Sequence, residues 1–285
     1  MFHARTVADM KSQERMLVES LKRYAAARGA EVQFLSHGWI AVLARNGHRH
    51  LVYGYDLGLN PSAAARIAND KAAAYEVLTA SGLAAVEHRV FLHPRFLDFV
   101  PVDGNWPGLL AAFAAFGRDA VIKDNEGTGG MEVFRVRTVT ELEQRALALF
   151  QIARAVALSP FLEIAGEARF VMLDGACVLA YAKQRKPGEW RHNLGLGARA
   201  VPLDLADAAA QPALALAKAA MAALTLRFAS IDIVTVGGRP MVMEANAGVM
   251  LEVASRPDFG GAALADRIYH AALDLALGGA AGSAQ

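Results

Sequence analysis

The sequence predicts an α+β fold, and three observations lead to this prediction. The chain has 285 residues, of which 54% are hydrophobic, so it can bury the core of one large or two moderate domains. Amphipathic runs with start and stop signals indicate several α-helices. Strand-like runs separated by glycine turns indicate β-hairpins in the same chain.

The first 60 residues predict a short N-terminal unit of one helix and three strands. Residues 10–28 place apolar side chains at helical spacing among lysine and arginine, and Gly29 ends the run. A loop follows at residues 54–60, and a helix opens at Pro61 or Ser62, the usual place for proline in a helix. The three strands are expected at residues 32–35, 39–44 and 49–53.

The middle of the chain predicts a pair of strands joined by a glycine-rich segment and flanked by helices. Residues 92–108 are rich in proline and glycine and indicate a loop. Thr140 and Glu143 have the spacing of a capping box, which predicts a helix from there to about Ala153. The remaining elements are expected as helices at 70–80 and 109–116, strands at 120–123 and 132–137, and the connecting segment at 126–131.

The last third of the chain predicts strands, a long helix, a hairpin and a closing helix. Residues 184–199 are polar and glycine-rich, which indicates a loop. Strands are expected at 157–163, 168–173, 176–183, 229–236 and 240–245, with helices at 206–226 and 262–277.

The charge balance and the termini exclude several classes of protein. Twenty-nine basic and 28 acidic residues leave a net charge of +1, so no nucleic-acid partner is expected. No apolar run reaches the ~18 residues of a membrane span, and the charged N-terminus lacks the apolar segment of a signal peptide. A single cysteine, Cys177, rules out an internal disulfide framework and fits a reducing compartment. A cytoplasmic protein without a membrane partner is therefore expected.

The hairpin at residues 229–245 contains the strongest candidate metal site. A two-residue Gly237-Gly238 turn would pair Asp232 with Met243, whereas a three-residue loop would pair Asp232 with Glu244. Asn246 then lies on the same face as Glu244. Two carboxylates and an amide oxygen suit Mg²⁺ bridged to phosphates. The alternative is a solvated polar face, but the apolar neighbours make both strands look buried.

A glycine-rich segment and several cations could hold phosphate groups. The segment comprises Glu126, Gly127, Thr128, Gly129 and Gly130, whose backbone N–H groups could approach phosphate oxygens closely. An ordinary hairpin is the alternative for this segment. The cations are Lys71, Lys123 and Lys183, and the loop that follows Lys183 adds Arg185 and Arg191. Such a group suits an anionic intermediate, although each cation is also compatible with an exposed surface.

The order of these segments resembles the ATP-grasp superfamily, and in particular the RimK-type carboxylate–amine ligases. The resemblance covers about residues 61–254. Six segments carry it: Asn69-Asp-Lys71, VIKDNEGTGGMEV at 121–133, Gly166-Glu-Ala-Arg169, AKQRKPGEWRHN at 182–193, Ile231-Asp232-Ile233, and MEANAG at 243–248.

The resemblance implies a fold in which two α+β lobes, residues 61–158 and 159–285, sandwich ATP behind the shortened N-terminal unit at 1–60. It implies that Asp232, Glu244 and Asn246 bind two Mg²⁺ ions, or Mn²⁺ in their place. The other implied roles are phosphate contacts for Lys71 and Lys123; a lid at Glu126, Gly127, Thr128, Gly129 and Gly130; adenine contacts through the backbone at Pro160, Phe161 and Leu162; a ribose contact for Glu167; catalytic contacts for Lys183, Arg185 and Arg191; and a place beside them for Asn193.

The resemblance further implies an amide- or peptide-forming ligase that activates a small carboxylate as an acyl phosphate and releases ADP and phosphate. The amine partner is expected to be an amino acid or a peptide. The short N-terminal unit suggests a homodimer, because a second subunit could complete it. Two departures concern substrates: Ser159-Pro160 replaces the usual acidic residues of the adenine link, and residues 247–250 replace the usual Ser-Pro-Gly.

Two other functions remain open at this stage. One keeps the ATP site but transfers phosphate, or ligates a thiol or hydroxyl, instead of forming an amide. The other is a nucleotide-binding protein without catalysis.

Overall fold

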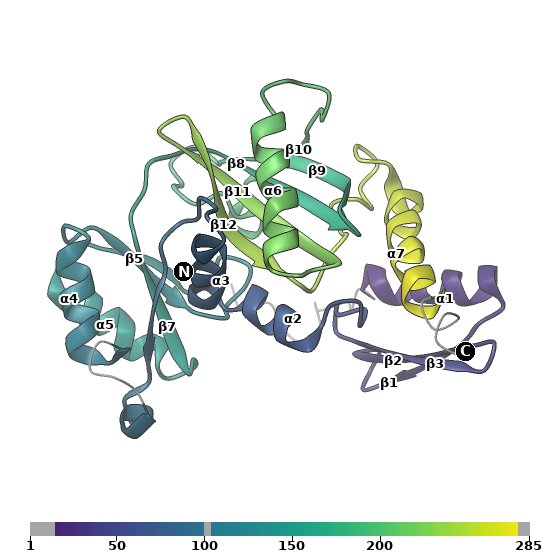
Figure 1. Cartoon of the computed structure of the whole chain (residues 1–285), viewed down its shortest axis with the longest axis horizontal. Helices are drawn as coiled ribbons and strands as arrows, with labels where there is room; N and C mark the ends of the chain where they lie inside the picture. Colours follow the sequence, from purple (N-terminus) through teal and green to yellow (C-terminus); the bar gives the residue numbers. More distant parts are fainter. Residues whose placement is uncertain (1–14, 100–103, 279–285) are drawn as a thin grey trace, which may run out of the picture. The chain divides into compact units, whose positions relative to one another are not determined.

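The computed structural model describes residues 15–99 and 104–278. Its described residues form two compact units, one within residues 1–59 and 250–285, and the other within residues 60–249 (Figure 1). On the N-terminal side, the two units divide between Leu59 and Asn60. The C-terminal side differs, because the closing helix belongs to the N-terminal unit and not to the lobe expected at 159–285. Among the described residues, no helix is long and apolar enough to span a bilayer.

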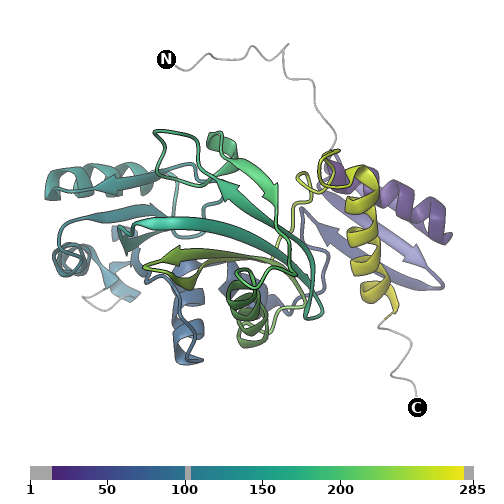
Figure 2. The same ribbon diagram turned by 90° about the horizontal axis from the view of Figure 1, so that it is seen from above.

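The smaller unit is a three-stranded antiparallel sheet with two helices packed together beside it (Figure 2). Gly29 ends the first helix in the left-handed conformation, with φ of 61°, as the sequence predicts. Tyr24 of that helix donates a hydrogen bond to Asp274 of the closing helix at 3.0 Å. Because the closing helix packs against the first helix, it belongs to the smaller unit and not to the lobe in which the sequence placed it. The elements are α1 (Met16–Arg28), β1 (Glu31–Leu35), β2 (Ile40–Arg45), β3 (His48–Tyr53) and α7 (Gly261–Gly278).

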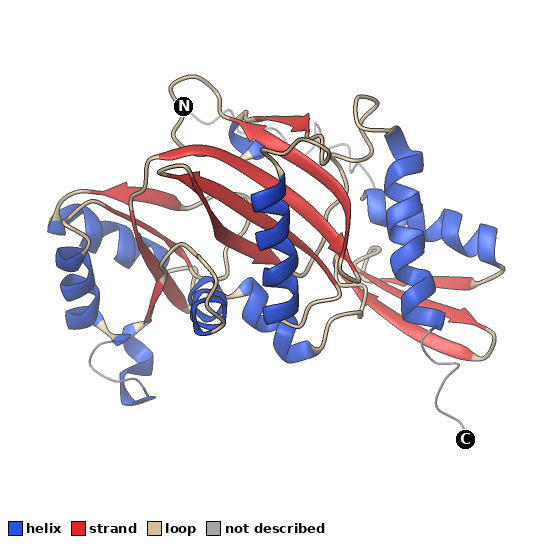
Figure 3. Ribbon diagram, turned by 45° about the horizontal axis from the view of Figure 1, so that its top comes forward, coloured by secondary structure: helices blue, strands red, loops and turns tan. Residues whose placement is uncertain are grey.

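The larger unit begins with α2 (Ser62–Asn69) and α3 (Lys71–Ala80) and contains two antiparallel sheets (Figure 3). The first sheet has the strand order β4-β7-β5-β6. Phe91, Ile122 and Leu158 point from one of its faces into a core shared with two helices. Because side chains alternate along a strand, Lys123 and Ala157 lie on the opposite face. The elements are β4 (Arg89–Leu92), α4 (Trp106–Ala115), β5 (Ala120–Asp124), β6 (Val133–Val136), α5 (Val139–Leu149) and β7 (Ala155–Pro160).

Two local predictions in this sheet are wrong. The capping box forms between Thr138 and Glu141, not between Thr140 and Glu143, so α5 begins two residues earlier in the same Thr-x-x-Glu spacing. The segment expected as loop at 92–108 contains the end of β4, a 3₁₀ helix at Pro94–Phe99 and the start of α4. Four-residue strands such as β4 give too short a pattern to distinguish from loop.

The second sheet has the strand order β10-β9-β8-β11-β12. Ile231 and Ile233 on its central part face a core that contains Leu214, Ala217 and Met221 of α6 (Gln211–Ala223). The opposite face has polar side chains. The strands are β8 (Ile164–Leu173), β9 (Ala176–Gln184), β10 (Arg199–Pro202), β11 (Phe228–Val236) and β12 (Arg239–Asn246). The expected loop at 184–199 is correct apart from the last residue of β9, a 3₁₀ turn at Leu194–Leu196 and the first residue of β10.

Candidate functional site

Asp232 and Glu244 face each other across β11 and β12, as the three-residue loop would require, but the loop itself has a different form. The turn contains only Gly237 and Gly238, with φ of 55° and 77°, and Val236 pairs directly with Arg239. A β-bulge at Met243 then inserts one extra residue, which shifts the register and brings Asp232 opposite Glu244. The predicted pairing is therefore present, while the predicted three-residue loop is wrong.

Asp232 is buried among cations on the polar face of the second sheet. Its exposed fraction is 2%. Arg169, its cross-strand neighbour on β8, donates two hydrogen bonds, from Nε to Oδ1 at 2.7 Å and from Nη2 to Oδ2 at 2.6 Å. Lys183 Nζ of β9 lies 2.9 Å from Oδ2 and also contacts Glu167 of β8. Burial alone would raise the pKa of Asp232, but Arg169 and Lys183 together hold it well below its ordinary value.

This bonding leaves Asp232 able to bind a metal through one oxygen. An ionised carboxylate has about four lone-pair sites, and three donors occupy three of them. The remaining site is on Oδ1. Glu244 is freer, because its nearest cation, Lys71 Nζ, lies 3.4 Å from Oε1. The Nδ2 atom of Asn246 is buried without a partner among the described residues.

The charge and the donor set of the site fit a metal-bound polyphosphate. Asp232, Glu244 and the Asn246 amide carry oxygen atoms on two neighbouring strands, and oxygen is the ligand atom that Mg²⁺ prefers. The structure contains no group of three or more His, Cys, Asp or Glu side chains at metal-binding distance within its described part, so bound phosphates and water would have to complete the coordination. Four cations surround three carboxylates, which leaves one positive charge for an anion. These residues are Lys71, Lys123, Arg169 and Lys183 on one side and Glu167, Asp232 and Glu244 on the other.

Lys123 lies at the end of β5 with an exposed fraction of 9%. Burial and, to a smaller extent, the nearby charge of Lys71 lower the pKa of Lys123 to about 8, although Glu244 and Glu167 act in the opposite direction. Its ammonium makes no hydrogen bond or ion pair among the residues that the structure describes. An anion that entered the site would supply the missing acceptor.

Lys71 joins the start of α3 to the glycine-rich segment. Its Nζ donates to the carbonyl oxygens of Gly127 at 2.6 Å and Asn125 at 3.3 Å. Asn125, which the sequence reasoning missed, is 1% exposed, and its Oδ1 accepts a hydrogen bond from the Ala72 N–H. Its place directly before the glycine-rich segment was the only signal that could have pointed to it.

The glycine-rich segment lies against the loop that follows β9. Gly130 has φ of 73°, and a Cβ added there would overlap the carboxamide of Asn193. Glu126, Thr128 and Gly129 are exposed, as a segment that covers a ligand requires. The structure thus brings the predicted lid and Asn193 together.

Gly130→Ala is expected to displace Asn193 and weaken ATP binding by roughly tenfold, because the new Cβ cannot fit. Gly129→Ala is a matched control, since Gly129 has φ of 76° but no atom near the position of its Cβ. Both variants carry a similar strain from positive φ. Titration calorimetry with a non-hydrolysable ATP analogue checks the difference. Equal affinities of the two variants would contradict the role of the Gly130–Asn193 contact.

The loop at residues 183–193 differs from the free cation cluster that the sequence suggested. Arg191 forms a two-point ion pair with Glu189, with both N–O distances at 2.9 Å, and also donates to the Val133 carbonyl at 3.3 Å. This ion pair lowers the pKa of Glu189 to about 2. Arg185 is exposed and has no ion pair among the described side chains. Arg191 therefore fastens the loop to β6 here, and only Lys183 of the three predicted catalytic cations lies in the Asp232 cluster.

The link between β7 and β8 offers few backbone groups to a nucleobase. Pro160 has no N–H, and the Phe161 N–H donates to the Asp119 carbonyl at 3.0 Å. The Leu162 N–H makes no backbone hydrogen bond within the described ranges. Arg135 lies 3.3 Å from the centroid of the Phe161 ring. The Pro160 carbonyl and the Leu162 N–H are the groups that remain for adenine.

Comparison with known proteins identifies the class and then the family. Residues 110–268 match the family model of the RimK-like ATP-grasp domain. A probable alpha-L-glutamate ligase of Pseudomonas fluorescens (strain SBW25) is 25% identical over 264 residues, covering 85% of this chain and 81% of the relative. A probable alpha-L-glutamate ligase of Psychromonas ingrahamii is 32% identical over 138 residues, covering 48% and 44% of the two chains.

Solved structures show the same fold. A D-alanine–D-alanine ligase from Bacillus anthracis complexed with ATP aligns with a TM-score of 0.57 and 18% identity, over 76% of this chain and 67% of that one. A D-cycloserine synthetase aligns with a TM-score of 0.56 and 23% identity, over 75% and 73%.

The matched family model places the protein in the ATP-grasp class. Because the family model covers more than half of its residues, the chain belongs to the RimK-like ATP-grasp family. It is an ATP-dependent carboxylate–amine ligase, which confirms the fold class and the activity that the sequence predicts. Enzymes of this family use ATP with a divalent metal.

Proposed function

We propose that the polar face of the second sheet, together with Lys71 and Lys123, binds ATP and activates a carboxylate as an acyl phosphate. One observation carries the proposal: Asp232 and Glu244 are brought face to face by a bulge, with buried cations on both sides. Buried carboxylates and buried cations in this number are costly unless they serve a charged ligand.

The residues have separate proposed roles. Asp232, Glu244 and Asn246 hold two Mg²⁺ ions, or Mn²⁺ in their place, which would neutralise charge on the β- and γ-phosphates. Lys71 and Lys123 contact the phosphates. The remaining proposed contacts are the lid (Glu126, Gly127, Thr128, Gly129 and Gly130), the adenine link (Pro160, Phe161 and Leu162), Glu167 at the ribose, and Lys183, Arg185, Arg191 and Asn193 near the transferred group.

Two of these roles require movement of side chains. Glu167 is paired with Lys183, so a ribose hydroxyl would have to share that carboxylate. Arg191 is paired with Glu189, so it reaches a phosphate only if that ion pair opens. Lys183 needs less change, because its contacts already lie beside Asp232.

The proposed reaction has two steps. A carboxylate oxygen of the substrate attacks the γ-phosphorus of ATP, and the bond to the β-phosphate oxygen breaks to release ADP. The amine nitrogen then attacks the acyl carbon, the carbon–oxygen bond to phosphate breaks, and the amine loses a proton to water or to the phosphate. The enzyme contributes position and positive charge, which is the usual basis of phosphoryl-transfer catalysis.

The substrates are proposed to be small amino acids or peptides. The probable alpha-L-glutamate ligases among the relatives make glutamate the first compound to test. A homodimer and a cytoplasmic location stay predictions from the sequence.

Hydroxylamine is expected to trap the proposed intermediate. With ATP, Mg²⁺ and the correct acid, an acyl phosphate gives a hydroxamate even without the amine, and mass spectrometry detects it together with ADP. Acids are screened first, and amines are added afterwards. ADP formation with a phosphorylated product but no hydroxamate would favour a phosphotransferase. ATP binding without turnover across the whole screen would favour a non-catalytic nucleotide-binding protein.

A further inference from the structure

His88 is a buried histidine next to the proposed phosphate site that has an unsatisfied hydrogen-bond acceptor. It directly precedes β4, and its exposed fraction is 2%. Its Nδ1 lies 2.9 Å from the Val86 carbonyl oxygen. A carbonyl can only accept, so Nδ1 carries the proton and Nε2 presents a lone pair. Nε2 is buried without a partner among the described residues, which is unfavourable for a polar atom.

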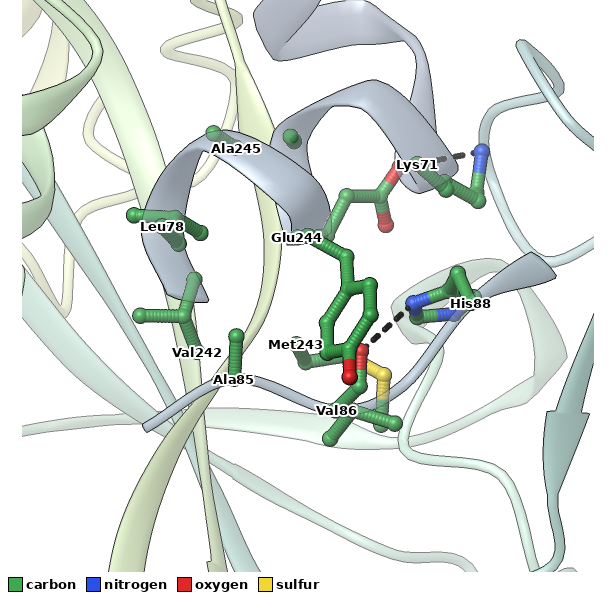
Figure 4. A pocket seen from close by; sticks show the side chains of 11 residues that line it. Lys71, Leu78, Ala85, Val86, His88, Val242, Met243, Glu244 and Ala245 are labelled. Carbon is green, nitrogen blue, oxygen red and sulfur yellow. Dashed lines mark hydrogen bonds and ion pairs between the residues drawn. The ribbon is translucent and has the colours of Figure 1, made fainter. Parts of the chain in front are cut away.

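The position of His88 connects it to the site. His88 lines a small cavity together with Lys71, Met243 and Glu244 (Figure 4). Figure 4 shows the Lys71–Glu244 ion pair and the His88–Val86 hydrogen bond on two sides of this cavity. His88 thus lines the same cavity as a carboxylate and a cation that we assign to the nucleotide and metal.

The sheet register places His88 on the same face as Lys123. Arg89 pairs with Leu158, and Lys123 pairs with Ala157, which lies on the strand between β4 and β5. Because side chains alternate, His88 and Lys123 both point away from the helix-covered core. His88 precedes Arg89, so it lies beside Ser159 and is diagonal to Lys123. The strand between them carries only two small buried side chains on this face, Ala157 and Ser159, and a long lysine side chain can extend past them.

Lys123 has the complementary deficiency. Its buried ammonium can donate three hydrogen bonds, and it makes none among the described residues. Lys71 repels it. Among the described residues, this face of the first sheet therefore has a buried donor without an acceptor, the Lys123 ammonium, and a buried acceptor without a donor, Nε2 of His88.

We infer that His88 is a positioning residue whose Nε2 accepts a hydrogen bond, through one water in the cavity, from the side of the Lys123 ammonium and holds that ammonium toward the nucleotide phosphates. The inference rests on the proposed phosphate contact of Lys123. A neutral imidazole suits this role, because it accepts without adding a third positive charge beside Lys71 and Lys123. Burial and these two lysines keep the pKa of His88 well below its ordinary value.

The test measures the affinity for a non-hydrolysable ATP analogue with Mg²⁺ by titration calorimetry. His88→Leu removes the acceptor and is expected to weaken binding roughly tenfold, the size expected for a hydrogen bond to a charged group. His88→Gln keeps an acceptor near the position of Nε2 and is expected to stay within about threefold of wild type. If His88 had a purely structural role, two variants with the same melting temperature would bind the analogue equally well. If His88→Leu melts early, His88→Met provides a second apolar replacement.

A double-mutant cycle shows whether His88 acts through Lys123. In a Lys123→Met background, His88→Leu is expected to have no further effect on affinity. Tyr75→Phe is a matched control, because Tyr75 lines the same cavity and its variant removes a hydroxyl but not the acceptor. This variant is expected to bind like wild type.

The outcomes separate the two proposals. If Lys123→Met binds the analogue like wild type, the proposed phosphate contact fails. If Lys123→Met weakens binding while His88→Leu does not, or if the two effects simply add, the inference about His88 is overturned and the phosphate contact stands.

Discussion

Glu244→Gln is expected to lower Mg²⁺-dependent ADP production by about 10³-fold while leaving the fold intact, because it removes a charged metal ligand from the transition state. The side chain of Glu244 is 22% exposed, and its one ion pair, with Lys71, is long at 3.4 Å. Its replacement by an isosteric amide therefore disturbs little packing. The measurement is a coupled ADP assay with a substrate pair from the hydroxamate screen, together with thermal unfolding.

Asp232→Ala is expected to abolish turnover equally but also to destabilise the fold. Asp232 is the common partner of Arg169 and Lys183, and removal of one member of a buried ion-pair network costs about 3–5 kcal/mol. Thermal unfolding should therefore separate the two variants, although both lose activity. Near-normal ADP production by either variant would show that the metal assignment is wrong.

Lys123→Met is expected to stabilise the protein and to weaken ATP binding by roughly 10- to 100-fold. The pKa of Lys123 is about 8 in the folded protein and 10.5 ordinarily, so the fold disfavours its charged form. Removal of that charge is expected to add on the order of 2–3 kcal/mol to the free energy of unfolding at neutral pH. The Lys123 side chain thus lowers the free energy of unfolding but provides a positive charge that can bind an anion.

The sign of the pH dependence follows from the direction of this shift. Between pH 8 and 10.5 the unfolded chain keeps the Lys123 proton and the folded protein releases it. The contribution of Lys123 to stability therefore rises with pH across this window, and Lys123→Met removes that rise. Bound phosphate favours the ammonium, so ATP binding near pH 8 is expected to take up a proton, and affinity should fall above that pH.

Calorimetry in buffers of different ionisation enthalpy measures the proton uptake. Lys218→Met is the matched control, because Lys218 is an exposed lysine of α6 and its charge should affect neither stability nor binding. Lower stability of Lys123→Met, or an unchanged proton uptake on ATP binding, would contradict the assignment of a strained cation at this position.

Much of the fold could be predicted from the sequence, and so could the residues that we propose as metal ligands. Alternation and continuous apolar runs indicate the strands, and Asp232, Glu244 and Asn246 were identified by residue type and spacing. The pairing of Asp232 with Glu244 was also predicted, but for the wrong reason. The turn is two residues long, and the bulge at Met243 corrects the register.

The bulge depends on contacts that no local pattern contains. Val242, directly before it, accepts a hydrogen bond from the Val86 N–H at 2.8 Å and donates to the Ala84 carbonyl at 2.9 Å. These bonds attach β12 to a segment more than 150 residues away in the chain. They fix the position of the strand end, so the extra residue must be accommodated between Val242 and Glu244.

The sequence by itself determined which elements form and which residue types can bind metal and phosphate, because these properties depend on local spacing and on side-chain chemistry. Only the tertiary structure decided which of the cations are free. It pairs Arg191 with Glu189 and surrounds Asp232 with Arg169 and Lys183. Among the described residues it leaves the Lys123 ammonium and the Nε2 atom of His88 without partners. Most of these partners lie on different strands that are distant in the sequence. The burial and the charge around a side chain therefore depend on which strands the fold brings next to it.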